Sequence, residues 1–104
     1  MDLGNMPEAV AHFQTVLNTN PRSAEALHDL GRALALSGRL SEGVRALQMA
    51  VQIQPDDADY HHDFGAALAR SGRINEAIAE MQTALRINPA HVEAQEALRL
   101  LIKK

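Results

Sequence analysis

The feature that most constrains the fold is an internal repeat with a constant spacing. Residues 28–39 read HDLGRALALSGR and residues 62–73 read HDFGAALARSGR, so nine of twelve letters recur. Pro21, Pro55 and Pro89 follow the same spacing. A fixed period of about 20 to 50 residues is typical of stacked supersecondary units. The sequence therefore predicts an array of repeated modules, and a chain of 104 residues fits one domain.

Each repeat carries the signals of two helices joined by a short turn. Ser23 and Asp57 are candidate N-caps, because their side-chain oxygens can accept hydrogen bonds from unpaired amides of the opening turn. Gly38 and Gly72 are candidate helix ends, where the backbone often needs a left-handed conformation. Only 3% of the residues are aromatic, which favours helix over sheet. We expect the second helix of each repeat to begin at about residue 41 or 75 and to end just before the proline.

The pattern resembles the tetratricopeptide repeat, a helix-turn-helix unit of about 34 residues with the signature W-x2-L-G-x2-Y, then A-x3-F, then P. The resemblance covers essentially the whole chain. It implies an all-α fold, a right-handed α-solenoid of stacked helix pairs. The matching positions are Leu27, Leu30, Gly31, Leu34, Gly43, Leu47, Ala50 and Pro55 in one block, and His61, Phe64, Gly65, Leu68, Ala77, Met81, Ala84 and Pro89 in the next.

The chain departs from the signature at its large aromatic positions. Leu27 and His61 stand in the tryptophan place, and Leu34 and Leu68 stand in the tyrosine place. His61 therefore puts a polar ring where a large apolar group is usual. Gly43 replaces an alanine, and we expect this glycine to cost about 1 kcal/mol of helix stability.

The repeat frame is offset from the ends of the sequence. Residues 1–20 match only the second helix of a repeat, residues 21–54 and 55–88 are whole repeats, and residues 89–104 match only a first helix. The expected domain therefore contains a half repeat, two full repeats and a half repeat, with about six helices.

Helical geometry separates a packing face from an outward face on the first helix of each repeat. The resemblance implies that the outward faces line a concave groove that binds a peptide or protein, so that the chain is a protein-interaction scaffold. The predicted groove residues are Glu25, His28, Asp29, Arg32, Leu36, Asp59, His62, Asp63, Ala66 and Arg70.

The acids and histidines of this set suggest a partner with basic or hydrogen-bond-donating groups, because a carboxylate only accepts hydrogen bonds. The alternative is a solvated face without a ligand. In that case Asp29 would pair with Arg32 and Asp59 with His62 as helix neighbours, each pair worth about 0.2–0.5 kcal/mol.

Two further readings stay open. The helical ends could associate head to tail, with residues 92–104 of one molecule on residues 5–18 of the next, which would give rings or filaments. Alternatively, the chain could be the substrate-recruiting arm of a larger enzyme. The residues expected to mediate self-association are Phe13, Leu98, Leu100, Leu101 and Ile102.

Other classes of function find little support. The net charge of −3 and the scarcity of aromatics disfavour nucleic acid, and no apolar run approaches the length of a membrane span. No signal-peptide pattern is evident, so a cytoplasmic protein is the default expectation. His28 and His62 are too far apart on successive repeats to share one metal ion, and no nucleophile accompanies the His-Asp pairs. We therefore expect no catalysis, no metal and no cofactor.

Overall fold

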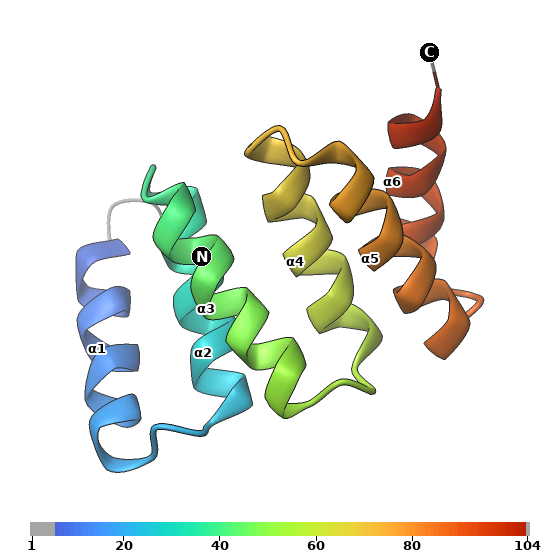
Figure 1. The fold of residues 1–104 in the computed structure, drawn as a ribbon. Helices are drawn as coiled ribbons and strands as arrows, with labels where there is room; N and C mark the ends of the chain where they lie inside the picture. The colour runs from blue at the N-terminus through green and yellow to red at the C-terminus, as the bar shows by residue number, and fades with distance from the viewer. Residues whose placement is uncertain (1–5, 104) are drawn as a thin grey trace.

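The computed structural model describes the backbone of residues 6–103 and the side chains of residues 7–103. This part of the chain forms six α-helices in sequential antiparallel pairs (Figure 1). The predicted all-α architecture is confirmed. The predicted segments 1–20 and 89–104 also include residues 1–5 and 104, which lie outside the described residues. The helices are α1 (Met6–Thr19), α2 (Ala24–Leu36), α3 (Leu40–Ile53), α4 (Ala58–Arg70), α5 (Ile74–Ile87) and α6 (Val92–Ile102).

The predicted helix caps are present. The side chain of Ser23 accepts a hydrogen bond from the Ala26 amide at 3.1 Å, and that of Asp57 accepts one from the Tyr60 amide at 3.1 Å. These bonds satisfy amides that the first turns of α2 and α4 leave unpaired.

The turns within the repeats use glycine as expected. Gly38 has a φ of +88° and Gly72 a φ of +85°, the left-handed region that glycine enters without a steric penalty. α3 and α5 then begin at Leu40 and Ile74, one residue earlier than the sequence suggested.

The helices form a single row with dimensions of 40 × 26 × 20 Å. Within it, α2 packs most extensively against α3, and α4 against α5. Leu47, Leu68 and Met81 are the largest fully buried side chains. Small residues let the helices approach closely around them. The alanines with no exposed surface are Ala33, Ala50, Ala77, Ala84 and Ala94.

Gly43 lies at a close contact between helices that the sequence did not predict. A Cβ placed on Gly43 would lie 2.8 Å from the backbone oxygen of Gly31 and 2.9 Å from the backbone nitrogen of Ala35. α2 and α3 therefore touch backbone to backbone at this point. Any loss of helix propensity at Gly43 is accompanied by a close helix contact that a side chain would prevent.

The polar ring of His61 is buried, and both ring nitrogens have hydrogen-bond partners. Nδ1 donates to the Glu80 carboxylate at 2.7 Å, and Nε2 lies 2.7 Å from the Pro55 carbonyl oxygen. His61 thus joins α4 to α5 and to the turn before α4. No described helix is long and apolar enough to cross a bilayer.

Candidate functional site

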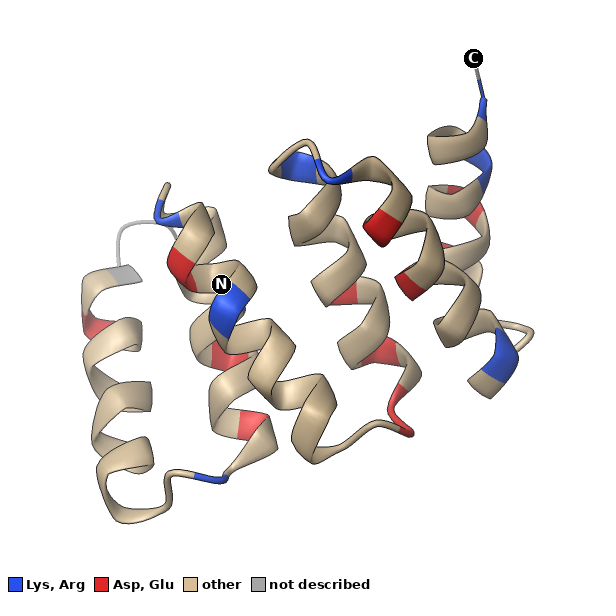
Figure 2. Ribbon diagram, viewed as in Figure 1, with Lys and Arg blue, Asp and Glu red and all other residues tan. Residues whose placement is uncertain are grey.

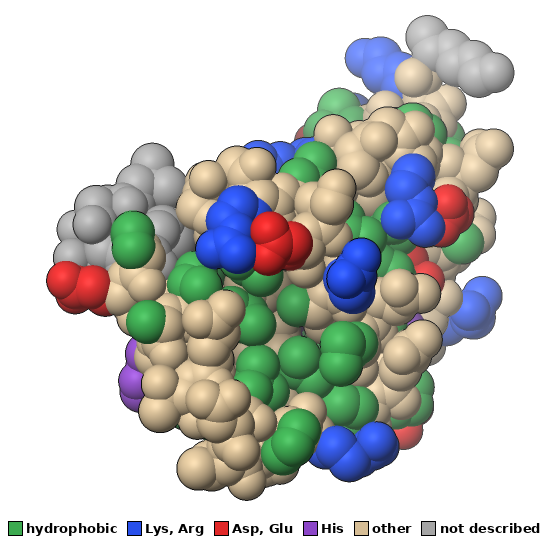
Figure 3. All heavy atoms as spheres, turned by 60° about the vertical axis from the view of Figure 1, so that its left-hand side comes forward, with side chains coloured by type: hydrophobic (Ala, Val, Ile, Leu, Met, Phe, Trp, Pro, Cys, Tyr) green, Lys and Arg blue, Asp and Glu red, His purple; other side chains and the backbone are tan. Residues whose placement is uncertain are grey.

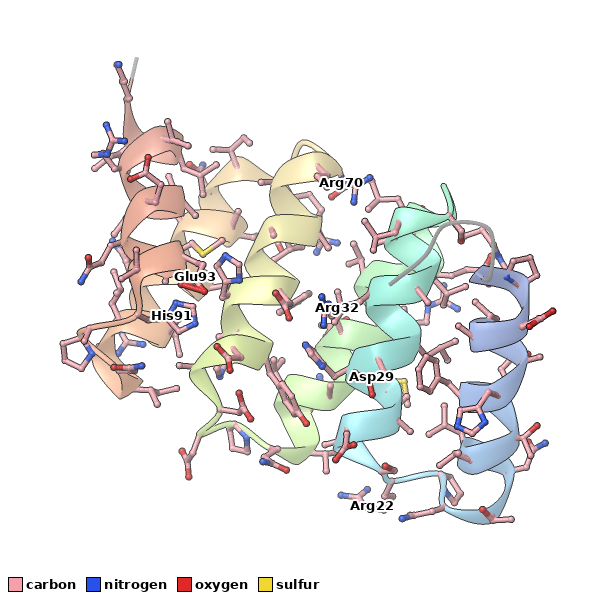
Figure 4. The ribbon with its side chains drawn as sticks, turned by 180° about the vertical axis from the view of Figure 1, so that it is seen from behind. Arg22, Asp29, Arg32, Arg70, His91 and Glu93 are labelled. Atoms are coloured by element: carbon pink, nitrogen blue, oxygen red, sulfur yellow. The ribbon has the colours of Figure 1, made fainter. Side chains whose placement is uncertain are left out.

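The first helices of the repeats, α2, α4 and α6, share one face of the molecule, which Figure 4 shows from behind. α4 contacts both α2 and α6. A hollow of about 140 Å³ lies between α2 and α4. We call it the interhelix groove. From the predicted set, Arg32, Leu36, Asp63, Ala66 and Arg70 line this groove, together with Ala35, Leu47 and Ala67.

His28 does not lie on the open face. It is only 7% exposed, and its Nε2 donates to Asp63 Oδ2 at 2.5 Å, from α2 across to α4. Its ring also stacks on Tyr60 with centroids 4.4 Å apart. The expectation of an outward His28 that packing does not require is therefore wrong. The pattern along one helix contains no information about the next repeat, and α4 of that repeat covers this edge of α2.

Asp63 is the centre of a hydrogen-bonded group. Besides the bond from His28, its other oxygen accepts from His62 Nδ1 at 3.0 Å, and Arg32 Nε lies 3.8 Å away. Burial by itself raises the pKa of the Asp63 carboxyl, but the hydrogen bonds and charges of the two histidines outweigh it. The pKa of Asp63 therefore lies well below its ordinary value.

A second histidine contact ties α4 to α6. His91 Nε2 donates to Asp59 Oδ1 at 2.6 Å, while its Nδ1 accepts from the Ala94 amide at 3.1 Å. His91 therefore caps α6 and bridges to the preceding repeat. Neither the cap nor the bridge made by His91 was predicted from the sequence. The signal was its position, since His91 follows the N-caps Ser23 and Asp57 at the spacing of the repeat.

The helix-neighbour ion pairs expected for a purely solvated face are not formed among the described residues. Asp29 lies 3.4 Å from His28 instead of pairing with Arg32, and Asp59 bonds His91 instead of His62. The contacts between helices on this face include the hydrogen bonds of His28 with Asp63 and of His91 with Asp59. Glu25 and Asp29 at the start of α2 keep partly exposed carboxylates.

The charges of this face are separated along the helices. Figure 2 shows acidic residues along the lower parts of α2 and α4 and basic residues near the upper end of α4. Arg32 and Arg70 are labelled between α2 and α4 in Figure 4. The Arg32 side chain is 48% exposed, and within residues 7–103 no ion pair involves Arg70. The interhelix groove therefore offers two accessible guanidinium groups.

The residues expected to mediate self-association fall into two groups. Phe13, Leu98 and Leu101 pack, partly buried, against the hydrophobic core of their own molecule. Leu100 and Ile102 are each 58% exposed. Of the four predicted α6 residues, two therefore pack inside the chain and two remain exposed.

A second hollow lies on the other side of α2, bounded by α1 and α3. Figure 3 shows hydrophobic side chains gathered on this side of the molecule. Its walls carry Glu42 and Arg45 beside Met49. Leu27 and Leu34 lie in it at the places where the repeat signature has tryptophan and tyrosine.

The described part of the chain has no cluster of potential metal ligands. No group of three or more His, Cys, Asp or Glu side chains in residues 7–103 is arranged to hold a metal ion. His62 and His91 have ring centroids 5.3 Å apart, but both nitrogens of His91 are already hydrogen-bonded.

A row of antiparallel helix pairs with a hollowed first-helix face defines a helical repeat protein of the interaction-module class. The chain belongs to the tetratricopeptide repeat family. One family model described as tetratricopeptide repeat matches residues 1–70, and a second with the same description matches residues 58–91. None of the curated protein sequences gives a significant match.

Solved structures share the fold over nearly the whole chain. MamA is 23% identical with a TM-score of 0.88, and the match covers 94% of this chain and 57% of MamA. An O-GlcNAc transferase mutant from Thermobaculum terrenum is 28% identical with a TM-score of 0.90, over 96% of this chain and 19% of the transferase. YrrB, described as a TPR protein with an unusual peptide-binding site, is 25% identical with a TM-score of 0.85, over 93% of this chain and 50% of YrrB. The chain thus spans between about a fifth and three fifths of these proteins.

Proposed function

We propose that this chain is a protein-interaction module that binds an extended segment of a partner protein in the interhelix groove. The observation that carries the proposal is the hollow between α2 and α4, which combines an alanine floor with charged walls. Small apolar pockets with a few polar groups are the usual form of a binding site. A groove of this size accepts one or two side chains of a partner and leaves its backbone outside.

The similarity to YrrB supports this proposal, because that protein is described as having a peptide-binding site. The match to 19% of an O-GlcNAc transferase supports the alternative that the chain is the substrate-recruiting arm of a larger enzyme. The exposed carboxylates of Glu25 and Asp29 would accept hydrogen bonds from donor groups of the partner at the N-terminal end of α2.

The proposal is tested by selecting peptides from a random display library on the purified chain and measuring their affinities by calorimetry. Ala66→Gln places a larger neutral side chain in the groove, and Ala79→Gln makes the same change at an exposed site on α5. We expect Ala66→Gln to weaken binding about tenfold, which corresponds to about 1.4 kcal/mol. Ala79→Gln should bind like the wild type. Equal affinities for both variants would move the binding site elsewhere.

A further inference from the structure

We infer that the interhelix groove selects an acidic partner segment, in which two side-chain carboxylates flank one aliphatic residue. This inference rests on the proposed function and adds the chemical class of the ligand. The sequence suggested a basic partner because the face is rich in acidic residues. The hydrogen bonds of those acids within the protein could not be predicted from the sequence.

The carboxylate inside the groove is already occupied. Asp63 accepts hydrogen bonds from His28 at 2.5 Å and from His62 at 3.0 Å, with Arg32 at 3.8 Å. A basic side chain entering the groove would therefore find both oxygens of this acid already hydrogen-bonded. The next acid of the face, Asp59, is bonded to His91.

The arginines of the groove are available instead. Arg32 has five N–H donors and, within residues 7–103, makes a single long contact, at 3.8 Å to Asp63. Arg70 is exposed and forms no ion pair within residues 7–103. A guanidinium group pairs with a carboxylate through two parallel hydrogen bonds, which makes such contacts both strong and specific. The unused hydrogen-bonding capacity of the groove is thus cationic.

The two arginines come from opposite walls with an apolar surface between them. Arg32 projects from α2 and Arg70 from α4, as the labels in Figure 4 show. Between them lie Ala66 and the 45%-exposed Leu36. This surface suits an aliphatic side chain, because burying it removes apolar area from water on both partners. A single terminal carboxylate would reach one wall and leave the alanine floor uncovered, so the carboxylates are assigned to side chains of two different residues.

Accessible acids lie toward the N-terminal ends of the two helices, with Glu25 and Asp29 on α2 and Asp59, whose side chain is 77% exposed, on α4. They repel an acidic segment that extends in that direction. The arginine end of the groove is therefore where the acidic segment is placed.

The test uses three sets of short peptides with acetylated N-termini and amidated C-termini. Each peptide has a central leucine, flanked by Asp or Glu in the first set, by Asn or Gln in the second and by Lys in the third. The affinity of each set is measured for the wild type, for Arg32→Gln/Arg70→Gln, and for the control Arg45→Gln/Arg86→Gln. The control removes the same charge from α3 and α5, outside the groove.

The wild type should bind the acidic set at least about tenfold more tightly than the neutral set, as expected for charge-assisted contacts. That preference should disappear in Arg32→Gln/Arg70→Gln, persist in the control and shrink as salt is raised. Equal binding of acidic and neutral sets, or equal losses in both variants, would overturn the inference while leaving groove binding in place. A fourth set repeats the acidic peptides with free C-terminal carboxylates, and binding of this set alone would overturn the assignment to side-chain carboxylates. Failure of all four sets would contradict the proposed function itself.

Discussion

One position in the repeat is filled by two different residue pairs. In the first repeat Leu27 and Ala46 occupy the places that His61 and Glu80 occupy in the second, since each pair is related by the repeat spacing. The apolar pair lines an open hollow. The polar pair forms a hydrogen bond of 2.7 Å with little exposure to solvent. Equivalent positions of the two repeats are thus filled by an apolar pair in the first and by a hydrogen-bonded polar pair in the second.

We predict that Glu80→Ala destabilises the fold by about 1–3 kcal/mol, because it leaves a buried ring nitrogen of His61 without a partner. The double variant His61→Leu/Glu80→Ala copies the first repeat and should be more stable than Glu80→Ala alone. Replacing a buried polar pair with apolar residues is often neutral, whereas breaking it is costly. Urea unfolding of the two single variants and the double variant measures the coupling. Additive losses would show that the two side chains do not act as a pair.

The backbone contact at Gly43 leads to a second prediction. Gly43→Ala should lower the free energy of unfolding by about 1–3 kcal/mol, because a new Cβ would collide with backbone atoms of α2. Helix propensity alone predicts a gain of about 1 kcal/mol. Ala79→Gly, at an exposed position of α5, measures the effect of helix propensity on stability without a collision. A stabilised Gly43→Ala protein would mean that the two helices can separate at little cost.

These residues show what the sequence could and could not predict. Caps at Ser23 and Asp57 and turns at Gly38 and Gly72 depend on local backbone chemistry, and all four were predicted correctly. The use of Gly43 and the burial of His28 depend on neighbouring helices. A pattern read along one helix contains no information about those neighbours.

Between elements, Asp63 links α2 to α4 through its bond with His28. The pKa of Asp63 is lower in the folded protein than in the unfolded chain, so the carboxylate stabilises the fold at pH values above the unfolded pKa of about 4. This contribution is lost as the pH falls below that value. We predict that Asp63→Asn costs about 1–3 kcal/mol at pH 7 and that its difference from wild type shrinks below about pH 4.

Urea unfolding of both proteins across this pH range is the relevant measurement. The titratable and charged groups that face Asp63 are His28, His62 and Arg32, and all three are unchanged in the variant. Asp56→Asn at an exposed site is the control and should show no such difference. A difference between Asp63→Asn and wild type that is constant from pH 7 to about pH 3 would contradict this role.

The last helix carries a residue that opposes regular stacking. Arg99 stands where Gly31 and Gly65 allow a second helix to approach α2 and α4, and Gln95 stands where the first repeat has Leu27. A head-to-tail joint built like the α2 and α3 pair would force Arg99 into that contact. We therefore predict that the wild type scatters light as a monomer of 11.3 kDa at high concentration.

The variant Gln95→Leu/Arg99→Gly restores the residue types of the first repeat on α6 and should promote association through its newly apolar surface. Arg86→Gly on α5 is the control for the loss of an arginine within a helix. Oligomers of the wild type would show that the joint tolerates Arg99. A monomeric double variant would show that α6 does not provide a joint.

For the candidate site, the repeat period predicted the face, but it could not predict which acids of that face are hydrogen-bonded across the repeats. The repeat period placed Arg32, Leu36, Ala66 and Arg70 on the same side of successive first helices, and these residues line one groove. The hydrogen bonds of Asp63 with His28 and of Asp59 with His91 join residues 32 to 35 positions apart. Only the packing of successive repeats reveals them.

At the scale of the whole molecule, the array uses different sides of its helices for packing and for recognition. Contacts within each repeat bury glycine, alanine and leucine, and contacts between repeats include the histidine bonds from α2 to α4 and from α4 to α6. These bonds fix the relative position of the first helices. The groove is therefore formed before a ligand binds, which lowers the entropic cost of binding.

The most direct test of this account is a titration of the labelled chain with an acidic, leucine-centred peptide, followed by two-dimensional amide NMR. We predict that the perturbed amides cluster on the C-terminal halves of α2 and α4, around Arg32, Leu36, Ala66 and Arg70. Signals of α5 should change little. Perturbations centred on the hollow between α1 and α3, around Arg45 and Met49, would contradict the assignment of the interhelix groove as the binding site.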